Sequence, residues 1–300
     1  MPWETALRVA LALLFVGAWH LVFGWLWNRV AAVRRGRRAP SRWPGRLLTL
    51  LKHGFLFLCA VGVTVLLANF YVYHGFGHQP DIYRRGDPAR PWVALTFDDG
   101  PSPQYTPRIL EILEKHGVPA TFFMVGAHVE AYPDIAAAVV EAGHEVGNHT
   151  YSHINVPTAS TQRLYEEMLG TTAVILEVTG QYPRYVRPPR GLYDGRFRRM
   201  AALLGQEVVL WNRSSFDWQG SLSPQAIVRR IVNEARPGDI LLFHDSGALI
   251  GREGGNREAT VQALEGIILG VRAKGLEFVP LSQLLHGVEG EADPPFNLVE

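Results

Sequence analysis

The segment WVALTFDDG, residues 92–100, sets the architecture of most of this chain. It is a short apolar run that ends in two carboxylates and a glycine, a pattern typical of a buried strand that leads into a polar turn. Thr106 and Pro107 then open a helix that runs to about His116 and stops at Gly117. Proline in the first turn and glycine past the end are the usual helix boundaries. The segment therefore predicts a strand followed by a helix.

The same alternation repeats along the chain after residue 92. It predicts strands at 92–97, 121–125, 145–148, 185–187, 208–211, 240–243 and 277–279, and helices at 106–116, 133–142, 160–178, 195–204, 224–235 and 257–273. Strands that alternate with helices indicate an α/β domain with parallel strands and outer helices. About seven strand-helix units fit either a distorted (β/α) barrel or a doubly wound open sheet, because both place polar sites at the carboxyl ends of their strands.

The first 80 residues have a different character. Residues 9–27 and 47–73 are nearly continuous apolar runs, and residues 28–46 between them carry seven arginines and no acidic residue. A membrane span needs ~20 apolar residues, and short arginine-rich loops stay on the cytoplasmic side. We therefore expect a multi-pass membrane hairpin at the cell membrane, with lipid as a partner and the rest of the chain outside the cytoplasm. The expected domains are a hairpin at 1–80, a linker at 81–91, a catalytic domain at 92–285 and a flexible tail at 286–300.

Two alternatives to the hairpin stay open. The first apolar run has the length of a cleaved signal peptide, but its positive charge follows the run and does not precede it, the reverse of the usual order. Both runs also have the length of helices buried in a soluble domain, although each would then be apolar on every face.

Charge and cysteine content narrow the possible functions. Up to Pro80 there are nine basic residues and one acidic residue, whereas the remainder has 20 basic and 27 acidic residues. An acidic body is a poor match to nucleic acid, so no nucleic-acid partner is expected. The single cysteine, Cys59, excludes an intrachain disulfide. Any metal site must use histidine and carboxylate ligands.

Five polar clusters fall at or just beyond the expected strand ends. They are TFDDG at 96–100, HTYSH at 149–153, RPPRG at 187–191, DW at 217–218 and LLFHD at 241–245. His149 and His153 are four residues apart, which brings both rings to one side of a helical turn and suits one metal ion. His116, His128, His144 and His286 lie outside the clusters and are assigned no role.

The ordered set of clusters resembles the polysaccharide deacetylases, the carbohydrate esterase family built on the NodB homology domain. The resemblance covers roughly Trp92 to Leu285 and implies the distorted barrel. It also implies that Asp99, His149 and His153 bind one divalent metal ion, with zinc as the first choice, while iron, cobalt and nickel accept the same ligands.

The resemblance also assigns the remaining site residues. It implies that Asp98 is the catalytic base, paired with Arg187, and that His244 is the general acid, oriented by Asp217. It implies that Trp218 walls the pocket and that Leu242 lines a slot for the acetyl methyl group. It also implies that the main-chain N–H of Arg190 stabilises the oxyanion. Many relatives have tyrosine at the position of Arg190 and an additional aspartate at that of Ser214. Side-chain contacts with the substrate are expected to differ at Arg190, and hydrogen bonding within the loop is expected to differ at Ser214.

Taken together, these features predict hydrolytic N-deacetylation of an acetylated glycan. The expected location outside the membrane favours peptidoglycan N-acetylglucosamine as substrate, with chitin, chitooligosaccharides or an exported polysaccharide second. A membrane-anchored glycan-binding pseudoenzyme is a rival of another class, and so is a protein whose hairpin assembles with a membrane complex. The complete set of metal ligands, base and acid argues against the pseudoenzyme, because binding alone needs neither base nor acid. Acetate release by the chain without residues 1–80 would distinguish the enzyme from the second rival.

Overall fold

The computed structural model describes residues 24, 53–65, 81–219, 222–247 and 255–287. The chain divides into two compact units, residues 1–76 and 77–300. Residues 53–65 of the first unit are helical, and within the described residues no helix combines the length and the hydropathy of a membrane span. Most of the expected helices 9–27 and 47–73, all of the loop 28–46 and most of the tail 286–300 lie outside the described residues.

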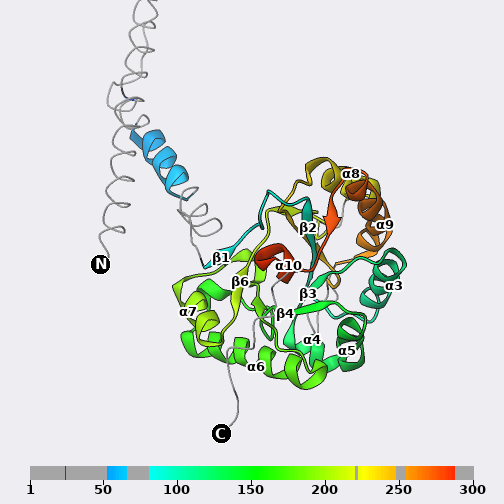
Figure 1. Ribbon diagram of the computed structural model, residues 1–300. Coiled ribbons are helices and arrows are strands. Elements are labelled where there is room, and N and C mark those ends of the chain that lie inside the picture. Colours follow the sequence, from blue (N-terminus) through cyan, green and yellow to red (C-terminus); the bar gives the residue numbers. More distant parts are fainter. Residues whose placement is uncertain (1–23, 25–52, 66–80, 220–221, 248–254, 288–300) are drawn as a thin grey trace, which may run out of the picture. The chain divides into compact units, whose positions relative to one another are not determined.

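The second unit contains one parallel sheet (Figure 1). Its strands are β1 (Ile82–Tyr83), β2 (Trp92–Asp98), β3 (Thr121–Met124), β4 (Glu145–Asn148), β5 (Tyr185–Val186), β6 (Glu207–Val209), β7 (Arg213–Ser214), β8 (Ile240–His244) and β9 (Glu277–Phe278). They follow the order β1-β6-β5-β4-β3-β2-β8-β7, with β9 beside β2. Among the described residues no pairing joins β1 to β7, so the curved sheet is an open half barrel. The α/β class and the parallel barrel-like sheet are confirmed.

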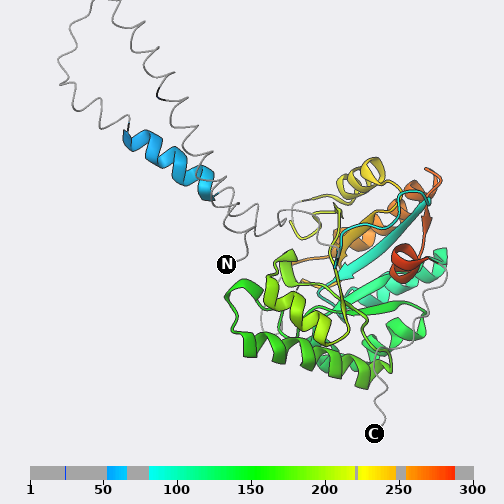
Figure 2. The same ribbon diagram turned by 60° about the vertical axis from the view of Figure 1, so that its left-hand side comes forward.

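Helices follow the strands in chain order. They are α3 (Thr106–His116), α4 (Gly126–Ala131), α5 (Pro133–Glu141), α6 (Thr161–Thr179), α7 (Gly195–Leu203), α8 (Pro224–Glu234), α9 (Glu258–Arg272) and α10 (Leu281–His286). Figure 2 shows α6 and its neighbours along the outside of the sheet, while α10 lies against the inner side of the curve. The outer helices bury one apolar stripe each, as Ile109 and Leu113 of α3 do.

The two faces of β2 show how the sequence places the site. Val93, Leu95 and Phe97 belong to the core cluster under the outer helices. Ala94 belongs to the inner cluster. Successive residues of a strand point to opposite faces, so Thr96 and Asp98 continue the inner face that begins with Ala94. The polar end of β2 therefore faces the inside of the curve.

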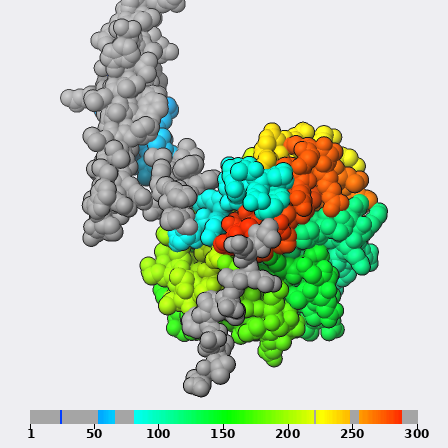
Figure 3. Space-filling model, in the orientation of Figure 1, coloured from blue at the N-terminus to red at the C-terminus, as the bar shows by residue number. Residues whose placement is uncertain are grey.

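Helix α10 packs against the amino ends of the strands. Leu281 and Leu284 lie in the inner cluster with Ala94 and Ile240. The carboxylate of Glu145, the first residue of β4, accepts the main-chain N–H groups of Leu281 and Ser282 at 2.9 and 3.2 Å, which stabilises the start of the helix. In Figure 3 the red segment that includes α10 fills the middle of this face. The site must therefore open at the opposite, carboxyl end.

Short elements depart from the expectations. Residues 81–91, expected to be a linker, contain β1, which pairs with β6 and buries Ile82. Helix α4 and strand β7 were not expected either. These elements are two to six residues long, too short to produce a readable hydrophobic period. The segment before β2 is therefore part of the folded unit.

Candidate active site

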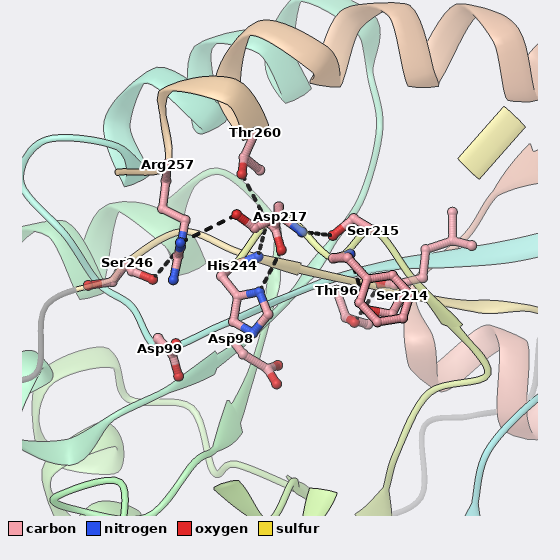
Figure 4. Close-up of polar contacts among 12 residues, drawn as sticks. Thr96, Asp98, Asp99, Ser214, Ser215, Asp217, His244, Ser246, Arg257 and Thr260 are labelled. Atoms are coloured by element: carbon pink, nitrogen blue, oxygen red, sulfur yellow. Dashed lines mark hydrogen bonds and ion pairs between the residues drawn. The ribbon is translucent and has the colours of Figure 1, made fainter. Parts of the chain in front are cut away.

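The expected site residues meet at the carboxyl ends of the parallel strands. Asp98 ends β2, His149 follows β4, Arg187 follows β5 and His244 ends β8. Asp98 and His244 are partners in the β2–β8 register, so the expected base and acid stand on adjacent strands. Asp217 follows β7, the neighbour of β8. Figure 4 shows Asp98 and Asp99 close to the His244 ring.

Asp99, His149 and His153 form a possible metal site. The Asp99 Oδ1 atom lies 3.4 Å from Nε2 of both histidines, and the three potential ligand atoms lie within 4.8 Å of one another. This carboxylate oxygen is buried and accepts no hydrogen bond, an unfavourable state that a bound cation would relieve. Nδ1 of His149 donates to the Arg187 carbonyl oxygen at 2.8 Å, which leaves the Nε2 lone pair facing Asp99. The arrangement fits the ion that the sequence predicted.

The protonation states of these groups suit metal binding. Burial, with added repulsion from His149 and Arg190, lowers the pKa of His153 to about 3, so the ring is neutral near pH 7. Burial raises the pKa of Asp99, but the neighbouring imidazoles of His149, His244 and His153 outweigh burial and lower that pKa overall. A neutral imidazole and an ionised carboxylate are the forms that bind a divalent ion.

Unusual backbone conformations direct the ligands. Asp99, Thr150 and His153 have φ values of 78°, 63° and 52°, in the left-handed region that costs a residue other than glycine free energy. In an extended strand, the adjacent side chains of Asp98 and Asp99 would point in opposite directions. The left-handed turn at Asp99 breaks that alternation, so both carboxylates lie near Nε2 of His149, at 3.8 and 3.4 Å.

Supporting residues that the sequence analysis missed hold this backbone. Glu167 of α6 is buried and accepts the N–H and the hydroxyl of Ser152 at 2.7 and 2.6 Å. His128 of α4 donates from Nδ1 to the Asp99 carbonyl oxygen at 2.7 Å. Neither residue lies in a polar cluster of the sequence, and each reaches the site from a helix more than ten residues away, so no local signal marks them.

Arg187 fixes Asp98. Its Nη1 donates to Asp98 Oδ1 at 2.6 Å and to Thr96 Oγ1 at 2.9 Å, and its guanidinium stacks on the Phe123 ring at 3.9 Å. Its Nε and Nη2 donate to the main-chain carbonyls of Val209 and Leu210 at 3.2 and 3.1 Å. The whole side chain is buried. The ion pair that the resemblance implied is thus present, and it holds the Asp98 carboxylate in one orientation.

Asp217 and His244 form the second pair. His244 Nδ1 donates to Asp217 Oδ1 at 2.7 Å. Burial lowers the pKa of His244, but the facing Asp217 carboxylate outweighs burial and raises that pKa to about 9. The imidazole is therefore protonated near pH 7 and has a proton to donate through Nε2, which the geometry of a general acid requires.

The expected substrate-binding residues occupy different environments. Arg190 is exposed and adopts φ 59° within a short 3₁₀ turn, Pro189–Gly191. Trp218 is 51% exposed, whereas Leu242 is only 2% exposed. Ser214 accepts the N–H of Phe216 through its hydroxyl at 3.2 Å. Arg190 and Trp218 are accessible to a glycan, while the contact expected for Leu242 stays a prediction because its side chain is almost fully covered.

Comparison with known proteins agrees with this geometry. A family model for polysaccharide deacetylases matches residues 85–209. A peptidoglycan-N-acetylglucosamine deacetylase of Bacillus cereus is 34% identical, with 65% of this chain and 68% of the relative covered. A chitooligosaccharide deacetylase of Bradyrhizobium sp. is 36% identical, with 64% and 90% covered. The structure of a CE4 family pseudoenzyme from Bacillus anthracis superposes with a TM-score of 0.63 at 30% identity, covering 70% of each chain.

The chain belongs to the polysaccharide deacetylase family. As a member it is a metal-dependent hydrolase that acts on amide bonds other than peptide bonds. The structural likeness to a pseudoenzyme shows that the fold does not decide catalysis by itself. The conclusion rests here on the family and on the named relatives, and the positions of Asp98, Asp99, His149, His153 and His244 agree with it.

Proposed function

We propose that this protein removes acetyl groups from N-acetylglucosamine units of peptidoglycan outside the cytoplasmic membrane. The observation that carries the proposal is the placement of a buried base, a protonated acid and a possible metal site around one strand edge. The relatives named for peptidoglycan and for chitooligosaccharides support this class of substrate. Chitin-type oligomers are the second candidate.

The proposed site would hold one divalent ion, with zinc as the first choice, on Asp99, His149 and His153. Such an ion would polarise the acetamide carbonyl and make the attacking water more acidic. The ligand types also accept cobalt, nickel or iron. The three ligands therefore do not select one metal, and zinc is part of the proposal.

The chain's own residues supply the proton transfers. Asp98, oriented by its ion pair with Arg187, accepts a proton from the attacking water. The main-chain N–H of Arg190 stabilises the oxyanion of the tetrahedral intermediate. His244 then donates its Nε2 proton to the departing nitrogen, so that acetate and a free amine leave. Asp217 keeps the imidazole in the tautomer and orientation that this step needs.

Arg190 distinguishes this site from relatives that have tyrosine at the same position. Its guanidinium is exposed and close enough to His153 to help lower the pKa of that ring. We assign it to an anionic group on the glycan. Trp218, also exposed, walls the sugar site, and Leu242 lines the acetyl slot.

The substrate proposal is tested by measuring acetate release by the purified protein from peptidoglycan, chitooligosaccharides and an unrelated acetylated polysaccharide. We expect the highest kcat/KM on peptidoglycan. A preference for chitooligosaccharides would replace the substrate but keep the chemistry. No acetate release from any acetylated glycan, in the presence of zinc, cobalt, nickel or iron, would favour the glycan-binding alternative.

The location is a separate proposal, which rests on the apolar runs 9–27 and 47–73 and on the seven arginines between them. We propose a hairpin with the loop 28–46 in the cytoplasm and the catalytic unit outside. Protease added to intact spheroplasts should then digest residues 81–287 and leave the loop protected. Protection of the catalytic unit until the cells are lysed would contradict this topology.

A further inference from the structure

The carboxylate of Asp217 is held at both of its oxygens. Oδ1 accepts the ring N–H of His244, and Oδ2 accepts the main-chain N–H of the same histidine at 2.9 Å. Oδ2 also accepts the hydroxyl of Thr260 at 2.9 Å. Figure 4 shows Thr260 reaching Asp217 from the side opposite to the His244 ring. The orienting carboxylate thus has a partner that comes from a distant helix.

Thr260 is the third residue of α9 and is 1% exposed. A threonine hydroxyl has one hydrogen to donate, and in a helix it usually goes to the carbonyl oxygen four residues earlier. Three threonines of α6 behave in that way, donating to the carbonyls of Glu167, Met168 and Ile175. The Thr260 hydroxyl donates to the Asp217 carboxylate instead. The hydroxyl hydrogen of Thr260 therefore bonds to the carboxylate that orients the His244 ring.

Arg257, the residue before α9, contacts the main chain of the same region. It is 5% exposed, and its Nε donates to the Ser246 carbonyl oxygen at 2.9 Å. Its Nη1 lies 3.5 Å from the Asp217 carbonyl oxygen. The start of α9 is thus linked both to Asp217 and to the segment that follows His244. These contacts limit how far the segment around Asp217 and the segment around Ser246 can move apart.

We propose that Thr260 is a positioning residue for the general acid. Its hydroxyl prevents rotation of the Asp217 carboxylate, a terminal torsion that is otherwise soft, and so keeps the His244 ring aimed at the leaving nitrogen. Arg257 assists by fixing the main chain of Asp217. The proposal rests on the proposed role of His244. Proton donation depends on alignment within a few tenths of an ångström, so the effect belongs to turnover and not to substrate binding.

The test compares Thr260→Val, which keeps the shape and removes the hydroxyl, with Thr260→Ser, which keeps the hydroxyl. For Thr260→Val we expect kcat to fall about tenfold with KM unchanged, because part of the general-acid contribution is lost. Thr260→Ser should stay within about twofold of the native kcat. Thr179→Val is the matched control, because that helical hydroxyl bonds the Ile175 carbonyl far from the site, and it should leave kcat unchanged. Bound metal is measured in each variant and should be equal.

A double-variant comparison separates positioning from general stability. If Thr260 acts through Asp217, adding Thr260→Val to Asp217→Ala should cause no further loss of kcat. An additive loss, or native kcat in Thr260→Val while His244→Ala is inactive, would overturn the proposal. Full activity in His244→Ala would instead remove the proposed acid itself. Should Thr260→Val fail to fold, Thr260→Ala takes its place in the same comparison.

Discussion

Asp98 and Asp99 are neighbours in the chain, yet their environments give them different chemistry. Asp98 is bonded to the buried Arg187 guanidinium, and Asp99 faces two imidazoles with one oxygen left without a donor. The sequence could predict both carboxylates from their place at a strand end. It could not predict Thr260, Glu167 or His128, because each reaches the site through tertiary packing that no local spacing encodes.

The pH dependence of turnover is a prediction at this scale. The pKa of His244 is raised to about 9 by Asp217 despite burial, and only the protonated ring can donate. The rate should therefore be insensitive to this group below about pH 9 and fall as the pH rises through it. Asp217→Asn removes the negative charge and should lower the pKa, moving the alkaline limb to lower pH. A pH–kcat profile of both proteins checks this; an unmoved alkaline limb would show that His244 is not the acid.

The two ends of the half barrel differ in what they carry. The carboxyl ends of β2, β4, β5 and β8 carry the proposed reacting groups, and α10 packs under the amino ends. The longer strands and helices could be predicted from their hydrophobic period and from proline and glycine at their boundaries. The strand expected at 92–97, for example, is observed as Trp92–Asp98. Short elements such as β1, β7 and α4 form because neighbours pair with them or cover them, which their own residues do not reveal.

Removing packing at the amino end should affect stability and leave chemistry intact. Leu284 of α10 is 3% exposed, so Leu284→Ala should lower the free energy of unfolding by about 2–4 kcal/mol with kcat unchanged. Leu203→Ala, at a side chain 65% exposed, is the control and should change stability by less than about 0.5 kcal/mol. Denaturant unfolding provides the measurement. A large fall in kcat at temperatures where Leu284→Ala stays folded would contradict the separation of the two ends.

At the scale of the whole molecule, a basic N-terminal region precedes an acidic catalytic unit. The sequence predicts that the first region lies in a membrane, whereas the family and the fold are carried by the second. The fold is shared with a pseudoenzyme, so the architecture by itself does not establish turnover. The central claim concerns the reacting groups that this chain places on the fold.

The most direct test of that claim measures acetate release together with bound metal in the native protein, in Asp98→Asn and in His244→Ala. Neither substitution removes one of the three expected ligands, so both variants should keep native metal content while losing nearly all activity. A chelator should abolish the native activity, and added divalent metal should restore it. Full acetate release by either metal-loaded variant would contradict the assignment of base and acid.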